Sequence, residues 1–185
     1  MRRSVVLLVL CCLGVGLAGC SVDVVVQTPD AAPSSYNVTV THAVDGDTID
    51  VRYANGSTER VRLIGIDTPE VHVETEPEDW AGIPDSEGGR RCLRNAGENA
   101  SAYVEEVLAG RSVRLELDSV GDTWGSYDRL LAYVYVDGEN LNYRLVAEGY
   151  AAVYPTEFEQ RDRFEAAEDE AIDANAGTWA CRRLG

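Results

Sequence analysis

The run Val61-Arg62-Leu63-Ile64-Gly65-Ile66-Asp67-Thr68-Pro69-Glu70 does most to decide the fold of this chain. Its first six residues alternate in the period of two that is typical of a β-strand. The strand leads without a break into a short segment with two carboxylates. The run therefore predicts a strand that carries Arg62 along its length and ends at an acidic cluster.

Four other segments show strand-like patterns, at residues 38–44, 49–53, 113–117 and 130–136. Asn55-Gly56 predicts a hairpin turn after the second strand. Helical spacing of apolar residues predicts helices at 100–108, 141–146 and 164–174, each followed by a glycine. A long acidic loop is expected from residue 71 to about residue 91. Five strands with a helix after the third predict an α+β fold, a five-stranded OB-fold β-barrel with three α-helices.

Charged residues gather at the predicted strand ends. Asp45-Gly46-Asp47-Thr48 precedes the second strand, and Tyr127-Asp128-Arg129 precedes the fifth. Asp-Gly alone is common turn chemistry, and a lone arginine is usually a solvated strand residue. In combination, carboxylates can hold a divalent cation and the planar guanidinium groups of Arg62 and Arg129 can clamp a phosphate. The pattern indicates metal-assisted phosphodiester cleavage.

These motifs, in this order over residues 38–179, resemble the staphylococcal-type thermonucleases. The resemblance implies a Ca²⁺-dependent nuclease that hydrolyses DNA and/or RNA and leaves 3′-phosphate products. It implies that Asp47 and Asp67 bind the metal through their side chains and Thr68 through its backbone carbonyl. Asp45 would lie beside these ligands without being one.

The resemblance also assigns catalytic roles. Glu70 would orient or deprotonate the attacking water, and Arg62 and Arg129 would stabilise the charge that develops on the phosphate. The positions that contact nucleotide in the family correspond to Leu63, Tyr127, Leu131 and Tyr154.

The chain departs from the family at three places near the substrate. Ser126 stands where the family usually has a basic residue, and Asp128 stands where it has glycine. The tyrosine that pairs with Tyr154 in the family has no counterpart. The first two changes lower the positive potential near the phosphate, so they affect affinity more than chemistry.

The N-terminus is typical of an export signal. Arg2 and Arg3 precede an apolar run, and Leu17-Ala18-Gly19-Cys20 resembles a lipobox in which Cys20 receives lipid. We predict a lipoprotein signal peptide at residues 1–19, a flexible tether at 20–36 and the nuclease domain at 37–185. The protein would then be an exported monomer, anchored by lipid to the outer face of the cell membrane. An uncleaved membrane anchor is the alternative, although the run is short for a spanning helix.

The chain has a formal net charge of -16, and all 16 of its basic residues are arginine. Nucleic-acid binding usually relies on a basic surface, so this balance is unusual for a nuclease. In molar salt the Debye length is only about 3 Å, and a distant acidic surface would hardly repel the substrate. We favour a halophilic protein. A GC-rich genome would explain the missing lysine but not the acidity.

Two of the 5 cysteines, Cys92 and Cys181, remain after the signal peptide and Cys20. An even number in an exported chain indicates a disulfide, with two free thiols as the alternative. His42 and His72 have no cysteine at ligand spacing, which argues against zinc. Two rival functions stay open: a catalytically weak OB-fold module that binds nucleic acid, and a surface lipoprotein that binds calcium for stability.

Overall fold

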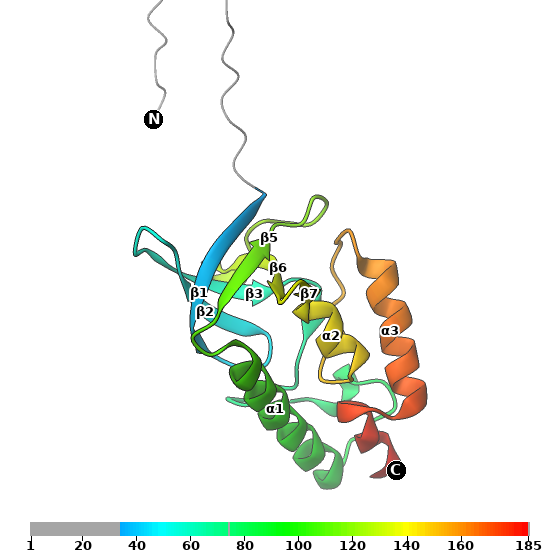
Figure 1. Cartoon of the computed structure of the whole chain (residues 1–185). Coiled ribbons are helices and arrows are strands. Elements are labelled where there is room, and N and C mark those ends of the chain that lie inside the picture. The colour runs from blue at the N-terminus through cyan, green and yellow to red at the C-terminus, as the bar shows by residue number, and fades with distance from the viewer. Residues whose placement is uncertain (1–33, 74, 185) are drawn as a thin grey trace, which may run out of the picture. The chain divides into compact units, whose positions relative to one another are not determined.

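Five strands close into the predicted barrel (Figure 1). They are β1 (Ser35–Ala43), β2 (Thr48–Arg52), β3 (Thr58–Leu63), β5 (Ser112–Glu116) and β6 (Leu130–Val136). Neighbours pair antiparallel in the order β3-β2-β1-β5-β6, and a parallel pairing of β3 with β6 closes the barrel. This is an OB-fold, so the predicted α+β class is confirmed. The structure is a computed structural model and describes residues 34–73 and 75–184.

Three α-helices lie against the barrel in the described part of the chain: α1 (Glu87–Leu108), α2 (Leu141–Ala147) and α3 (Arg161–Ala174). The expectation that the acidic loop reaches about residue 91 was wrong. Ser86 accepts a hydrogen bond from the backbone N–H of Gly89 and caps α1 there, so the helix begins at Glu87. Among the described residues, no helix is both long enough and apolar enough to cross a membrane.

Strand β3 ends three residues earlier than predicted. The backbone of Gly65 has a φ of 79°, a left-handed conformation that interrupts the strand. The chain then forms a separate strand, β4 (Ile66–Asp67), which pairs with β8 (Ala152–Val153). The remaining short elements are β7 (Glu139–Asn140) and the 3₁₀ segments η1 (Pro77–Asp79), η2 (Ser126–Asp128) and η3 (Gly177–Leu184).

Two apolar clusters hold these elements together. The larger fills the barrel and extends to α1, α2 and α3 through Val104, Leu145 and Phe164. The smaller contains Trp80 and Trp179, whose ring centroids lie 5.4 Å apart. A disulfide joins Cys92 to Cys181 beside this smaller cluster, with a Cα–Cα distance of 5.8 Å. The C-terminal end of the chain therefore lies against α1 (Figure 1).

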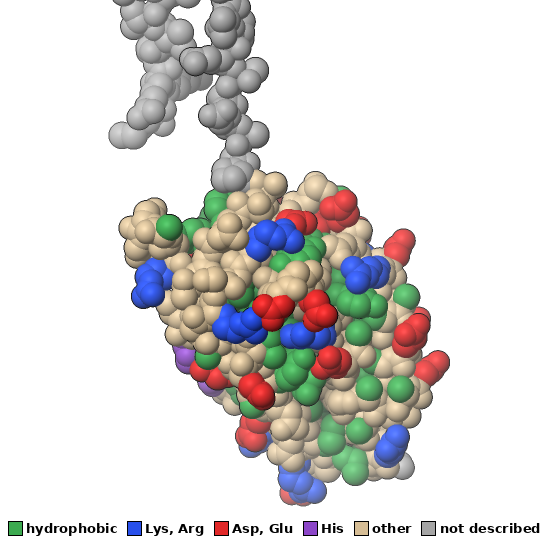
Figure 2. Space-filling model, in the orientation of Figure 1, with side chains coloured by type: hydrophobic (Ala, Val, Ile, Leu, Met, Phe, Trp, Pro, Cys, Tyr) green, Lys and Arg blue, Asp and Glu red, His purple; other side chains and the backbone are tan. Residues whose placement is uncertain are grey.

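Charged side chains of both signs are interspersed on the face of the domain shown in Figure 2, and hydrophobic side chains reach the surface between them. The predicted signal peptide, Cys20 and most of the predicted tether lie outside the described residues. The tether was predicted to reach residue 36, but β1 already begins at Ser35. Its first residues pair with β5, Ser35 opposite Glu116, so the barrel includes the end of that segment.

Candidate active site

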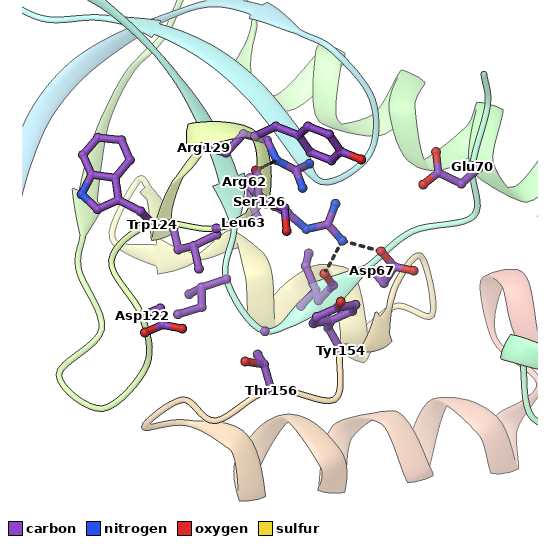
Figure 3. Close-up of a pocket in the computed structure, with 16 residues that line it drawn as sticks. Arg62, Leu63, Asp67, Glu70, Asp122, Trp124, Ser126, Arg129, Tyr154 and Thr156 are labelled. Carbon is purple, nitrogen blue, oxygen red and sulfur yellow. Dashed lines mark hydrogen bonds and ion pairs between the residues drawn. The ribbon is translucent and has the colours of Figure 1, made fainter. Parts of the chain in front are cut away.

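An open cleft with a volume of about 680 Å³ lies at one end of the barrel (Figure 3). It gathers most of the residues that the sequence indicates for catalysis and substrate binding. Those that line it are Arg62, Leu63, Asp67, Glu70, Tyr127, Arg129, Leu131 and Tyr154. Asp47 and Thr68 are buried; Asp47 adjoins the cleft through its contact with Arg62, and the backbone N–H of Thr68 donates to Asp47.

The barrel closure brings the two arginines to the same rim. In the parallel pairing of β3 with β6, Arg62 stands opposite Leu131. Arg129 comes two residues before Leu131, directly ahead of β6, so it enters the cleft beside Arg62. Arg62 and Arg129 are separated by 66 residues of chain, and the register of β3 with β6 brings them together.

Arg62 links two carboxylates. Its Nη1 donates to Asp47 Oδ1 at 2.8 Å, and its Nη2 donates to Asp67 Oδ1 in a short contact. Nη2 also donates to the carbonyl of Ile66 at 3.4 Å. Because both carboxylates contact one guanidinium group, the acidic residue just before β2 and the acidic residue at the end of β4 lie close together.

Asp47 sits in a dense network of donors. The hydroxyl of Thr48 donates to Asp47 Oδ1 at 2.9 Å, and the backbone N–H of Thr68 donates to Asp47 Oδ2 at 3.2 Å. Asp45 accepts a hydrogen bond from the backbone N–H of Asp47 at 3.1 Å. Asp45-Gly46-Asp47 is thus a turn, and that turn orients Asp47 toward Arg62. Gly46 allows the close approach, because a Cβ there would overlap the side chain of Thr68.

The environment disfavours negative charge on the acidic residues. Burial raises the pKa of Asp47 to about 7, although the positive charge of Arg62 opposes this shift. Burial also raises the pKa of Asp67, again against the charge and hydrogen bond of Arg62. The pKa of Glu70 is raised by burial and by the charges of Asp67 and Asp45. A positive charge next to a carboxylate favours its ionised form, so a cation bound here would oppose these shifts, as Arg62 does.

Glu70 is exposed at one side of the cleft (Figure 3). Its backbone N–H donates to Thr75 Oγ1 at 2.7 Å, and the Thr75 hydroxyl lies 3.3 Å from the Glu70 carbonyl. Thr75 is itself buried, so a fixed side chain holds the backbone that carries Glu70. The Glu70 carboxylate is thereby directed by the backbone while its own oxygens stay accessible.

Arg129 follows a tight turn. Tyr127 and Asp128 have φ values of 62° and 54°, in the left-handed region. The glycine that the family has at the Asp128 position suits this backbone, and aspartate is among the few other residues that adopt it readily. Arg129 Nε donates to the carbonyl of Ser126 at 3.1 Å, and its guanidinium lies 5.7 Å from the centre of the Tyr127 ring.

Tyr154 is positioned by the small sheet that the sequence did not predict. Its backbone N–H donates to the carbonyl of Gly65 at 3.0 Å, directly beyond the pairing of Ile66 with Val153. The guanidinium of Arg62 lies 5.6 Å from the centre of the Tyr154 ring. Leu63, which is buried, and Leu131, which is partly buried, line the same cleft.

The donors present suit a hard divalent cation. Asp47 and Asp67 supply carboxylate oxygens, and the backbone of Thr68 lies next to both. Within residues 34–73 and 75–184, no three Asp, Glu, His or Cys side chains are grouped to hold a metal ion. A site here would therefore need a backbone carbonyl and water as further ligands, which Ca²⁺ accepts readily.

Four residues of this region were missed at the level of sequence. Trp124, Asp122 and Thr156 line the cleft, and Thr75 holds the Glu70 backbone. Only Trp124 had a visible signal, a large aromatic residue followed by glycine in a predicted loop. The other three depend on how the loops fold back, which their spacing does not reveal.

Comparison with known proteins identifies the family. The profile of the staphylococcal nuclease homologue family matches residues 60–181. That span includes Arg62, Glu70 and Arg129, but Asp45 and Asp47 lie ahead of it.

Similar proteins of known sequence include two endonucleases of Bacillus subtilis. The SPbeta prophage-derived endonuclease YokF is 38% identical over 78% of this chain and 44% of its own length. Endonuclease YncB is 37% identical over 78% of this chain and 62% of its own length. The chain thus spans less than two thirds of either protein.

A thermonuclease from Staphylococcus intermedius is 34% identical over 76% of this chain and 74% of its own length. The matched region of this relative covers most of both chains, unlike that of the two longer endonucleases. Together with the profile match, this similarity shows that the chain belongs to the staphylococcal nuclease homologue family.

Proposed function

We propose that this member of the nuclease family is a Ca²⁺-dependent hydrolase of phosphodiester bonds in DNA and/or RNA. The observation that carries the proposal is that Arg62, Glu70 and Arg129 line the same cleft as Asp67. Relatives named thermonuclease and endonuclease support the class of reaction. A bound Ca²⁺ at Asp47, Asp67 and Thr68 would neutralise phosphate charge and acidify a bound water.

The protein groups have distinct parts in the proposed reaction. Glu70 accepts a proton from the attacking water or orients it toward phosphorus. Arg62 and Arg129 donate hydrogen bonds to the phosphate oxygens, on which negative charge accumulates as water adds. The bond from phosphorus to the 5′ oxygen breaks, and that oxygen takes up a proton. Of the two fragments of the cleaved strand, one then ends in a 3′-phosphate and the other begins with a 5′-hydroxyl.

Arg129 is better placed than Arg62 to meet a phosphate directly. Arg129 donates a hydrogen bond to the described residues only through Nε, which leaves both of its terminal nitrogens for a ligand. Both terminal nitrogens of Arg62 already contact carboxylates. We infer that cation binding at those carboxylates frees donors of Arg62 for the phosphate.

The test is digestion of plasmid DNA and of RNA with Ca²⁺, with Mg²⁺ and with chelator. We expect cleavage with Ca²⁺, little with chelator, and product 3′ ends that accept a label only after phosphatase treatment. Full activity in excess chelator would exclude the metal-dependent mechanism. Tight binding of nucleic acid without cleavage under any condition would favour the rival proposal, a noncatalytic OB-fold binding module.

Export and lipid attachment at Cys20 remain predictions from the sequence. On this basis we propose a cell-surface enzyme that meets nucleic acid outside the cell. Metabolic labelling with a fatty acid, compared between wild type and Cys20→Ala, would test the anchor.

A further inference from the structure

Three aromatic side chains stand out by exposure. Trp124, Tyr127 and Tyr154 keep 53%, 92% and 46% of their surface exposed. All three line the same cleft. Among the strongly exposed large hydrophobic residues in the described part of the chain, the others are aliphatic: Val73, Val120 and Leu184. Exposed aromatic rings along a groove are the usual means by which proteins bind single-stranded nucleic acid.

Trp124 differs from the two tyrosines in having an unoccupied ring face. Tyr154 lies under Arg62, and Tyr127 lies under Arg129. Trp124 makes no ring–ring or cation–π contact with any residue that the structure describes. In Figure 3 it lies at the opposite side of the view from Glu70, with Arg62 and Arg129 between them. The ring thus extends the cleft beyond the catalytic groups.

Backbone pairing with the start of β6 fixes the loop that carries Trp124. Trp124 forms an antiparallel bridge with Leu130, and the N–H of Leu131 donates to the Thr123 carbonyl at 2.9 Å. Gly125 lets the loop approach Leu131 closely, because a Cβ there would meet the leucine side chain. A fixed, exposed ring binds a ligand with little loss of conformational entropy.

The chemistry around Trp124 favours a base over a phosphate. Asp122 also lines the cleft and lies on the same side of Figure 3 as Trp124, and its carboxylate would repel a phosphate group. Leu131 and the indole offer an apolar surface that suits the flat face of a nucleobase. The chain also carries a net charge of -16 without any lysine, so a charge-independent contact would contribute more than usual to binding.

We propose that Trp124 stacks on a nucleobase of a nucleotide outside the one whose phosphate is cleaved, and that this contact makes the enzyme bind single strands of several nucleotides more tightly than dinucleotides. This inference rests on the proposed function, since it names a substrate contact of the same site. Stacking strengthens binding by roughly 5- to 160-fold per base, judged from alanine substitution in other single-strand binding proteins.

Fluorescence reports on this residue selectively. The other two tryptophans, Trp80 and Trp179, are 3% and 2% exposed and pack against each other in the smaller core. Single-stranded oligodeoxynucleotides, titrated in chelator so that they stay intact, should quench the emission of the wild-type protein. The quenching should grow from dinucleotide to octanucleotide and disappear in Trp124→Phe. An unquenched emission with bound octanucleotide, or equal quenching by a duplex, would overturn the stacking assignment.

Kinetics provide the second measurement. Trp124→Ala should raise KM about 5-fold or more for single-stranded octanucleotides, while kcat and the KM for a dinucleotide stay close to wild type. Trp124→Phe should restore part of the loss. Val120→Ala is the matched control, because Val120 is exposed in the same loop but does not line the cleft. An equal rise in KM for both substrate lengths would instead show a structural role and overturn the proposal.

The two proposals fail in different ways. A wild-type protein that cleaves nucleic acid without quenching or a length-dependent KM refutes only the role of Trp124. A wild-type protein that cleaves nothing refutes the proposed function, and the fluorescence titration still decides whether Trp124 contacts a base.

Discussion

The two arginines of the cleft illustrate how one residue type serves different ends. Arg62 is largely buried and bonded to Asp47 and Asp67, so it belongs to the framework as well as to the site. Arg129 is partly exposed and makes one hydrogen bond within the protein, to Ser126. Removal of Arg62 should therefore leave the buried carboxylate of Asp47 and the half-buried carboxylate of Asp67 without its compensating positive charge and lower stability. Removal of Arg129 should affect the reaction alone.

For Arg129→Ala we expect a single-turnover cleavage rate lower by ~10²–10³-fold, since one donor to the developing charge is lost. Its melting temperature should stay close to that of wild type. Arg60→Ala is the control, because Arg60 lies on β3 near Arg62 but pairs with Asp50 on an exposed surface outside the cleft. Wild-type cleavage by Arg129→Ala would refute the phosphate-clamp assignment.

At the scale of elements, α1 supports the segment that carries Glu70. Gly97 packs against this segment so closely that a Cβ would overlap the carbonyl oxygen of Pro69. Alanine normally favours a helix over glycine by ~1 kcal/mol, but here it would push the Glu70 backbone away. We expect Gly97→Ala to lower kcat by ~10- to 100-fold, as small displacements of catalytic groups do.

A second glycine of α1 provides the matched control for this displacement. The nearest atom to a Cβ on Gly88 would be the Ser86 hydroxyl oxygen at 3.6 Å, an ordinary contact. Gly88→Ala should keep full activity and a melting temperature equal to or above that of wild type. Equal kcat values for the two variants would show that α1 does not position Glu70.

The loop between β5 and β6 is held by one carboxylate. Burial acts to raise the pKa of Asp118, but hydrogen bonds donated by Gly121, Tyr133 and neighbouring groups outweigh it and lower the pKa. A lowered pKa in the folded state means that the ionised Asp118 stabilises the fold above its unfolded pKa of about 3.9. This contribution is lost as the pH falls through the folded pKa.

We therefore expect Asp118→Asn to unfold more readily than wild type at neutral pH, by roughly 1–3 kcal/mol. The difference should shrink in acid, where both side chains are uncharged. Urea unfolding over a series from neutral pH into acid measures it, with the exposed Asp169→Asn on α3 as control. A difference that does not change with pH would exclude the role of the Asp118 charge.

The sequence could predict elements whose signal is local. The segment from Leu130 to Val136, ended by Asp137-Gly138, predicted β6 at its observed bounds, and the acidic clusters and both arginines stood out because they lie near the ends of predicted strands. The pairing of β4 with β8 could not be foreseen, because each strand has two residues and its partner is distant in the chain. The same holds for Thr75, whose hydroxyl reaches Glu70 only through the path of the loop. The short-range pattern thus specifies residue types, and long-range register places them.

At the scale of the whole molecule, the disulfide between Cys92 and Cys181 closes a large loop. The cysteines are 89 residues apart, and the chain-entropy model assigns such a crosslink about 4–5 kcal/mol of stability. We expect reductant to lower the urea midpoint of unfolding markedly. Cleavage under native conditions should persist, because neither cysteine lines the cleft. Unchanged unfolding after reduction, with both thiols verified by alkylation and mass spectrometry, would contradict this expectation.

The excess of acidic residues sets the last expectation, which concerns salt. With a net charge of -16, carboxylates repel one another most strongly in dilute buffer, so the melting temperature should rise with added KCl. Salt also weakens contacts between arginine and phosphate through counterion release, which acts against cleavage. If stabilisation outweighs that loss, activity will be greatest at molar salt, as expected for a halophilic protein. Thermal melts and cleavage rates over the same KCl series separate the two effects. A flat melting temperature together with fastest cleavage in dilute buffer would refute the halophilic interpretation and leave the nuclease proposal intact, because the cleft does not depend on the distant surface charge.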